Sequence, residues 1–145
     1  MEVYSIGFTQ KTAEQFFNLL KQAGIRRLLD VRLNNVSQLA GFTKRDDLRY
    51  FVREICGAEY RHEPSLAPTP EILSAYRKQE CPWAEYERKF LALLEERQVE
   101  TRLERALFSV PTALLCSEPT AEQCHRRLVL EYLAGKWGQL EIVHL

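Results

Sequence analysis

The sequence of 145 residues carries 20 basic and 20 acidic side chains, so its formal net charge is zero. This balance excludes the overall basic excess on which non-specific nucleic-acid binding relies, and the longest apolar runs are too short for a membrane-spanning helix. The length and the hydrophobic content of 46% predict one soluble domain over residues 1–145, with no cofactor.

The N-terminal segment and the cysteines bear on the compartment. The first residues show no basic stretch followed by an apolar one, so we expect no signal peptide. The four cysteines of a chain without an export signal are typically reduced, which predicts a cytoplasmic protein. The pattern leaves the oligomeric state open.

The first third of the chain is typical of a β-α-β unit. A β-prone run at residues 3–6 comes first, and Thr12 with Gln15 forms a capping-box pattern that begins a helix. Apolar residues at helical spacing continue this helix to about Ala23. A second strand is predicted at 28–31, and this order favours two parallel strands with a right-handed crossover.

The middle of the chain is predicted to be mainly helical. After a polar loop at 33–43, a helix begins at about residue 46 and ends at Gly57, before a short strand at 59–62. A proline-rich loop then leads to two helices, at 71–79 and 83–100. The aromatic residues of the second of these lie at helical spacing, which indicates core packing.

The last third contains the most strand-like run, at 112–116, because it is short, apolar and bounded by prolines. A second capping-box pattern at Thr120 predicts the start of a helix that ends at Gly135 or Gly138. A final strand follows at 140–145. We therefore predict an α/β fold, a three-layer domain with a mainly parallel sheet of about five strands flanked by helices.

Chemically reactive residues follow four of the predicted strands. Parallel strands place their carboxyl ends at one edge of the sheet, where ligands bind in open α/β folds. The residues expected at this edge are Gly7, Phe8, Thr9, Asp30, Arg32, His62, Cys116, Ser117 and Glu118, joined by Cys124, His125 and Arg126 from the start of the last helix.

Several of these motifs resemble a known family, called domain of unknown function 488. The resemblance covers nearly the whole chain and is carried chiefly by Asp30-Val31-Arg32, Cys116-Ser117-Glu118 and Cys124-His125-Arg126. It implies an α/β fold and a shared site, and it brings no established reaction. The family usually has Gly-His-Ser after its first strand, whereas this chain has Gly7-Phe8-Thr9, so no base can come from Phe8.

The residue types at this edge predict an enzyme or binding protein for a phosphate- or carboxylate-bearing small molecule or a nucleotide. Arg32 and Arg126 would hold the anion. Asp30 or Glu118 would orient an arginine or act as a base, and His125 would transfer protons near neutral pH.

A nucleophilic cysteine is a bolder form of this hypothesis. Cys124 lies beside His125 and Arg126 early in a predicted helix, where the pKa of a thiol is lowered. Cys116 is the alternative nucleophile. Nine residues separate Cys116 from Arg126, which argues against the phosphatase pattern of Cys, five residues and Arg.

A purely structural interpretation stays open. Both thiols would then be small buried hydrophobic groups, and His125 would be a core histidine with its hydrogen bonds satisfied. An ion pair, either Asp30–Arg126 or Glu118–Arg32, would join neighbouring strand ends.

A metal or redox site at Cys116 and Cys124 is a further alternative. Seven residues separate the two thiols, and the adjacent Cys124 and His125 would point about 100° apart on a helix, so we expect no metal. A reversible disulfide depends on the distance between the thiols.

Two charged stretches have simpler explanations than a function. Residues 44–53 are locally basic with Tyr50 and Phe51 interleaved, which would suit nucleic-acid binding, but the helical spacing favours core packing for the two rings. Arg127 lies four residues before Glu131, which predicts a surface ion pair.

Overall fold

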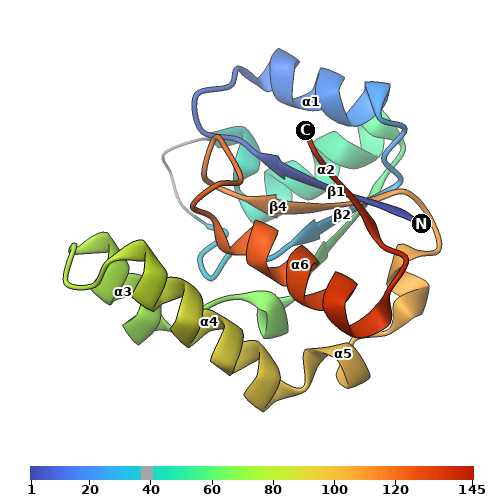
Figure 1. Cartoon of the computed structure of the whole chain (residues 1–145). Helices are drawn as coiled ribbons and strands as arrows, with labels where there is room; N and C mark the ends of the chain where they lie inside the picture. The colour runs from blue at the N-terminus through green and yellow to red at the C-terminus, as the bar shows by residue number, and fades with distance from the viewer. Residues whose placement is uncertain (37–40) are drawn as a thin grey trace.

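The computed structural model describes residues 1–36 and 41–145, so part of the predicted loop at 33–43 lies outside the described residues. It contains a five-stranded sheet in the order β3-β2-β4-β1-β5, in which every pairing is parallel (Figure 1). The strands are β1 (Glu2–Gly7), β2 (Arg27–Asp30), β3 (Glu59–His62), β4 (Thr112–Cys116) and β5 (Glu141–His144). The predicted α/β fold is confirmed.

The helices form one layer on each side of the sheet (Figure 1). One apolar core joins the sheet to α1 (Ala13–Gln22) and α2 (Arg45–Cys56). The other core joins it to α4 (Trp83–Arg97) and α6 (His125–Trp137), with α3 (Pro70–Arg77) and α5 (Val99–Arg102) beside them. Short 3-10 helices lie at Gly41–Thr43, Pro64–Leu66 and Arg105–Phe108.

The strand order places the end of β4 at a change of direction in the sheet. From β1 the chain moves through β2 to β3 along one direction, and from β3 it returns through β4 to β5 along the other. Right-handed crossovers therefore put α1 and α2 on one face and the later helices on the opposite face. The chain leaves β1 and β2 toward one face of the sheet and leaves β4, which lies between them, toward the other face. A crevice for a ligand therefore forms at the carboxyl end of β4 in such folds.

The predicted helix ends are mostly correct, and two differences have local causes. The capping box of Thr12 and Gln15 is present. The predicted helix at 83–100 is divided at Gln98, which adopts a left-handed conformation with φ of 52°. The helix predicted from 71 begins at Pro70, because the side chain of Thr69 caps it and a proline at the first helical position has no unsatisfied N–H.

The second predicted capping box is wrong. Helix α6 begins at His125 rather than after Thr120, and it continues through Gly135 to Trp137. Residues 117–124 form turns, since the Arg126 guanidinium holds the Glu118 carbonyl at 2.9 Å and so directs this segment across the sheet edge. A tertiary contact has overridden a local helix signal.

The aromatic pair on α2 is only half buried. Phe51 packs against the core as predicted, but the ring of Tyr50 is 54% exposed, so the prediction of core packing is wrong for Tyr50. Helical spacing places the two neighbours about 100° apart, and only one of them can face the sheet. Within the described residues, no helix is long and apolar enough to cross a membrane.

Strand β5 is joined to β1 by a hydrogen bond inside the sheet. Ser5 is fully buried and its Oγ accepts a hydrogen bond from Nε of Arg126 at 3.1 Å. The Ser5 hydroxyl hydrogen is therefore free to point to Nδ1 of His144, 2.5 Å away, provided that this nitrogen is unprotonated. Burial, and then the charge of Arg126, lower the pKa of His144 in agreement with this arrangement.

We expect the hydrogen bond between Ser5 and His144 to make the stability depend on pH. A lowered pKa in the folded state means that the stabilisation is complete above the ordinary histidine value of 6.5 and is lost as the pH falls through the lowered value. His144→Ala should cost about 1 kcal/mol in unfolding free energy at neutral pH and progressively less in acid. Urea denaturation at several pH values measures this. Val143→Ala, at the neighbouring position, should lower the unfolding free energy by the same amount at every pH. If the loss caused by His144→Ala were also independent of pH, the assignment of this hydrogen bond would be contradicted.

Candidate functional site

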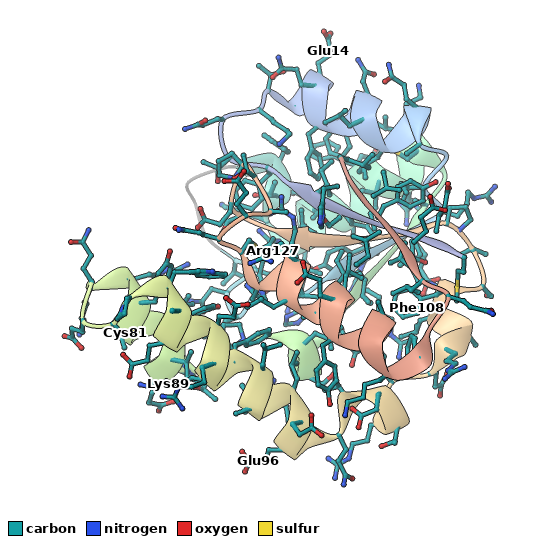
Figure 2. All side chains as sticks on the ribbon, in the orientation of Figure 1. Glu14, Cys81, Lys89, Glu96, Phe108 and Arg127 are labelled. Carbon is teal, nitrogen blue, oxygen red and sulfur yellow. The ribbon has the colours of Figure 1, made fainter. Side chains whose placement is uncertain are left out.

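A cavity of about 910 Å³ lies at the carboxyl edge of the sheet, between the loops after β1, β2 and β4 and the helices α3 and α4. Figure 2 labels Cys81, at the turn between α3 and α4, and Arg127, near the start of α6. Of the seven residues predicted to act in catalysis or anion binding, five line the cavity: Arg32, Cys116, Glu118, Cys124 and His125. Asp30 and Arg126 are fully buried and lie outside this lining.

Cys116 and His125 form a close pair at the base of the cavity. Sγ of Cys116, the last residue of β4, lies 3.5 Å from Nδ1 of His125. Nε2 of His125 lies 2.7 Å from the carbonyl oxygen of Val31, and because a carbonyl only accepts, Nε2 carries the hydrogen. The imidazole is therefore fixed with Nδ1 toward the thiol, where it accepts the thiol proton.

Cys124 completes a cluster of three reactive groups. It is the residue before α6 and has an extended backbone, with φ of −139° and ψ of 140°. Its sulfur, the sulfur of Cys116 and a ring nitrogen of His125 all lie within 4.8 Å of one another. The prediction that Cys124 and His125 would point apart is wrong because only His125 belongs to the helix. The described residues thus contain a set of soft ligands that could hold a metal ion.

The two thiols differ in acidity. A hydrogen bond from Cys124, followed by the charges of His125 and Arg126, lowers the pKa of Cys116 well below its ordinary value. Burial and then the neighbouring Cys116 raise the pKa of Cys124. Burial lowers the pKa of His125, but the charge of Cys116 and the hydrogen bonds to Cys116 and to the Val31 carbonyl together outweigh it, and the net pKa is raised. The sequence-based expectation of a lowered thiol pKa at Cys124 is therefore wrong, and that property belongs to Cys116.

Arg126 is a buried cation that holds the backbone around the site. Nη1 donates to the Glu118 carbonyl at 2.9 Å, and Nε donates to Ser5. Gly7 makes this approach possible, since a Cβ there would lie 1.6 Å from the Glu118 oxygen. Arg126 has no carboxylate partner among the residues that the structure describes. Its charge therefore favours the thiolate of Cys116.

Asp30 and Arg32 pair with each other rather than with the partners predicted for them. Nε and Nη2 of Arg32 each donate to the Asp30 carboxylate at 2.9 Å, and the Tyr60 hydroxyl donates to the same carboxylate at 2.5 Å. The predicted pairs Asp30–Arg126 and Glu118–Arg32 are wrong, because residues two apart on an extended chain lie on one side of it. Arg32 also lies 5.3 Å from the ring centre of Phe8 and reaches the cavity.

Other predicted residues have smaller parts. Nε2 of His62 is hydrogen-bonded to the Arg32 carbonyl at 2.9 Å, and His62 does not line the cavity. Ser117 lines it, and its carbonyl accepts from the N–H of Thr9 at 3.0 Å. The predicted surface ion pair of Arg127 and Glu131 is confirmed at 3.1 Å.

Sequence reasoning missed several residues at the site. The missed cavity residues include five that are cationic or aromatic: Lys11, Phe42, Tyr76, Arg77 and Trp83. Tyr86, predicted as core, is buried and also lines the cavity. Ser5 had a recognisable signal, since it is a polar residue inside an apolar strand-like run. The other residues lie on α3, α4 and surface loops, where no pattern distinguishes a cavity wall from ordinary surface.

Comparison with known proteins identifies one family. A family described as "domain of unknown function DUF488" matches residues 12–133, from the N-cap of α1 into α6. The match includes Asp30, Cys116 and the segment Cys124-His125-Arg126. Neither the curated proteins nor the solved structures contain a match to the chain.

We expect Gly7→Ala to disrupt the site and the fold together. The added methyl group would overlap the Glu118 carbonyl, so the segment held by Arg126 must move, at a cost of about 2–3 kcal/mol in unfolding free energy. Gly135→Ala is the matched control, because it lies inside α6 with nothing within 4 Å of the new Cβ, and it should be neutral or slightly stabilising. Urea denaturation decides, and equal stabilities for the two variants would refute the role of Gly7.

Proposed function

The chain belongs to the DUF488 family, and within it we propose that the protein is a cysteine-dependent enzyme in which Cys116 attacks an anionic small molecule. The observation that carries the proposal is the pair of Cys116 and His125, with Sγ 3.5 Å from Nδ1 and Nε2 bonded to the Val31 carbonyl. An oriented base beside a thiol at the wall of a cavity is the arrangement that nucleophilic catalysis requires.

The proposed reaction has two balanced steps. The Cys116 thiolate forms a bond to an electrophilic carbon of the substrate, and the leaving group departs with the bonding electrons and takes the proton from Nδ1 of His125. Water or another acceptor then gives its proton to Nδ1 and attacks the same carbon. The bond to sulfur breaks, its electrons return to Cys116, and the thiolate and imidazolium are restored.

The neighbouring groups support separate parts of this chemistry. Cys124 keeps its proton because its pKa is raised, and its hydrogen bond lowers the pKa of Cys116. The permanent charge of Arg126 favours the thiolate from behind the cavity wall. Arg126 therefore acts on the nucleophile in this proposal, whereas the sequence suggested that it would hold the substrate.

An anionic substrate suits the charges of the cavity. The described lining of the cavity contains three side chains with a lysine or arginine charge, Lys11, Arg32 and Arg77, and one carboxylate, Glu118. Arg32 is neutralised in part by Asp30, which leaves Lys11 and Arg77 as the cations most available to a phosphate or carboxylate.

A metal centre is a second candidate, favoured by the cluster of Cys116, Cys124 and His125. Two thiols and one imidazole, with a cavity beside them, would suit a zinc ion that keeps one position open. The hydrogen bond of His125 to Val31 would fix its free nitrogen toward the ion.

A nucleic-acid-binding role has weaker support. The basic residues Arg45 and Arg53 of α2 pair with their acidic neighbours Asp46 and Glu54, which reduces the charge of that surface.

We expect Cys116 to be alkylated by iodoacetamide far faster near pH 7 than an ordinary thiol. Its thiolate persists down to a lowered pKa, so the rate should fall only in more acidic solution. His125→Gln should move this profile to higher pH, and Cys116→Ser should abolish the fast phase. Cys56, whose pKa is raised by burial, is the internal control and should react only in alkaline solution. Peptide mass spectrometry distinguishes the sites, and an ordinary profile at Cys116 would refute the nucleophile.

Elemental analysis of the purified protein separates the two candidates. A nucleophilic Cys116 predicts no stoichiometric zinc or iron in active protein and fast alkylation without a chelator. The metal centre would instead be established if the protein held one equivalent of zinc and the zinc protected Cys116 from alkylation. Both the zinc and the protection should then be lost in Cys124→Ser.

A further inference from the structure

We propose that the substrate of this site is a mononucleotide-sized molecule, with a flat ring held by the aromatic wall of the cavity and an anionic group held by Lys11 and Arg77. This inference rests on the proposed function, because it names the substrate class for the same nucleophile. It is carried by three independent features of the cavity, which are its aromatic wall, its cations without carboxylate partners and its volume.

The aromatic wall is the first feature. Tyr76 at the end of α3, with Trp83 and Tyr86 at the start of α4, forms a cluster with ring centres 4.9–5.6 Å apart, and all three residues line the cavity. Phe8 and Phe42 add two more rings from the loop side. An aromatic lining of this kind favours a flat ring over a flexible chain, because stacked and edge-to-face contacts with a ring add to simple burial.

The aromatic wall lies next to the proposed nucleophile. Tyr86 stacks on Phe90 with ring centres 6.1 Å apart, and Phe90 in turn packs against the ring of His125 at 5.4 Å. The hydroxyl of Tyr76 donates to Gln123, the residue before Cys124, at 3.1 Å. A ring held on this wall would therefore lie in the same cavity as Cys116.

The second feature is a pair of cations without acidic partners. Neither Lys11 nor Arg77 forms an ion pair with a carboxylate in residues 1–36 and 41–145. Nζ of Lys11 reaches the Pro119 carbonyl at 3.4 Å, and burial followed by the charge of Arg126 lowers the pKa of Lys11. Lys11 and Arg77 reach the cavity from the β1–α1 loop and from α3 respectively, so both are available to an anion held in it.

The third feature is size. A volume of about 910 Å³ lies in the range of sites that enclose one small molecule. A ring with one attached phosphate fits this volume.

The test uses matched probes and the Cys116→Ser variant, so that binding is measured without turnover. Isothermal titration compares the four ribonucleoside monophosphates with the corresponding nucleosides, which lack the anion, and with ribose 5-phosphate, which lacks the ring. We expect at least one monophosphate to bind about tenfold or more tightly than both of its fragments.

Variants of the aromatic wall and of the cations show which part of the nucleotide each of them holds. Tyr76→Leu should weaken the best monophosphate about tenfold and leave ribose 5-phosphate unchanged, whereas Tyr76→Phe, which keeps the ring, should retain most of the affinity. Arg77→Gln should weaken both phosphates and leave the nucleoside unchanged. Tyr50→Leu on α2 and Lys78→Gln, next to Arg77 but outside the cavity lining, are the controls and should have no effect.

The outcomes separate this inference from the proposed function. The substrate class is overturned if the monophosphates bind no more tightly than their fragments, or if only oligonucleotides bind. In either case, fast alkylation of Cys116 would still support the nucleophile. A monophosphate that binds as expected to protein whose Cys116 reacts as an ordinary thiol would support the ligand and overturn the nucleophile.

Discussion

The guanidinium of Arg126 lies fully buried between β1 and the segment after β4, with a serine hydroxyl and a backbone carbonyl as its acceptors. A permanent charge in such a place needs compensation, because the side chain of arginine does not lose its proton in proteins. The charge of Arg126 lowers the pKa of the Cys116 thiol, so a thiolate at Cys116 offsets part of this charge. The cation thus couples the packing of the sheet to the acidity of the nucleophile, and Gly7 supplies the space in which this contact forms.

The topology explains why these groups meet at β4. The strand lies between β1 and β2, so its carboxyl end is flanked by the loop that carries Phe8 and by the segment that carries Arg32. Hydrogen bonds cross between these ends: Thr9 donates to the Ser117 carbonyl, and His125 is bonded to the carbonyl of Val31. The first of these bonds joins main-chain groups, and the second fixes the side chain of His125, so three strand ends are held together and the base is oriented at the same time.

The strands and most helices could be predicted because their signals are local: alternation, capping residues and glycine at helix ends. The common location of Cys116 and His125 also followed from the rule for parallel sheets. The partner of Asp30 could have been inferred from the same sequence, since Arg32 lies two residues away. The start of α6 could not, because it depends on Arg126 and Gly7, which are far apart in the chain. The aromatic wall of Tyr76 and Trp83 could not be predicted either, because residues that face the core and residues that face a cavity have the same helical spacing.

The helix α3 has no buried residue, whereas the loops on the other side of the cavity are fixed by hydrogen bonds to the sheet. The free energy of local opening is set by the apolar area and the bonds that are lost, so α3 can separate from the domain at a smaller cost than the strand ends can. An opening of α3 would therefore widen the cavity while the geometry around Cys116 stays unchanged. Amide hydrogens of residues 70–77 should therefore exchange faster than those of α6. The residues that carry the chemistry and the helix that admits molecules to the cavity would then belong to different parts of the chain.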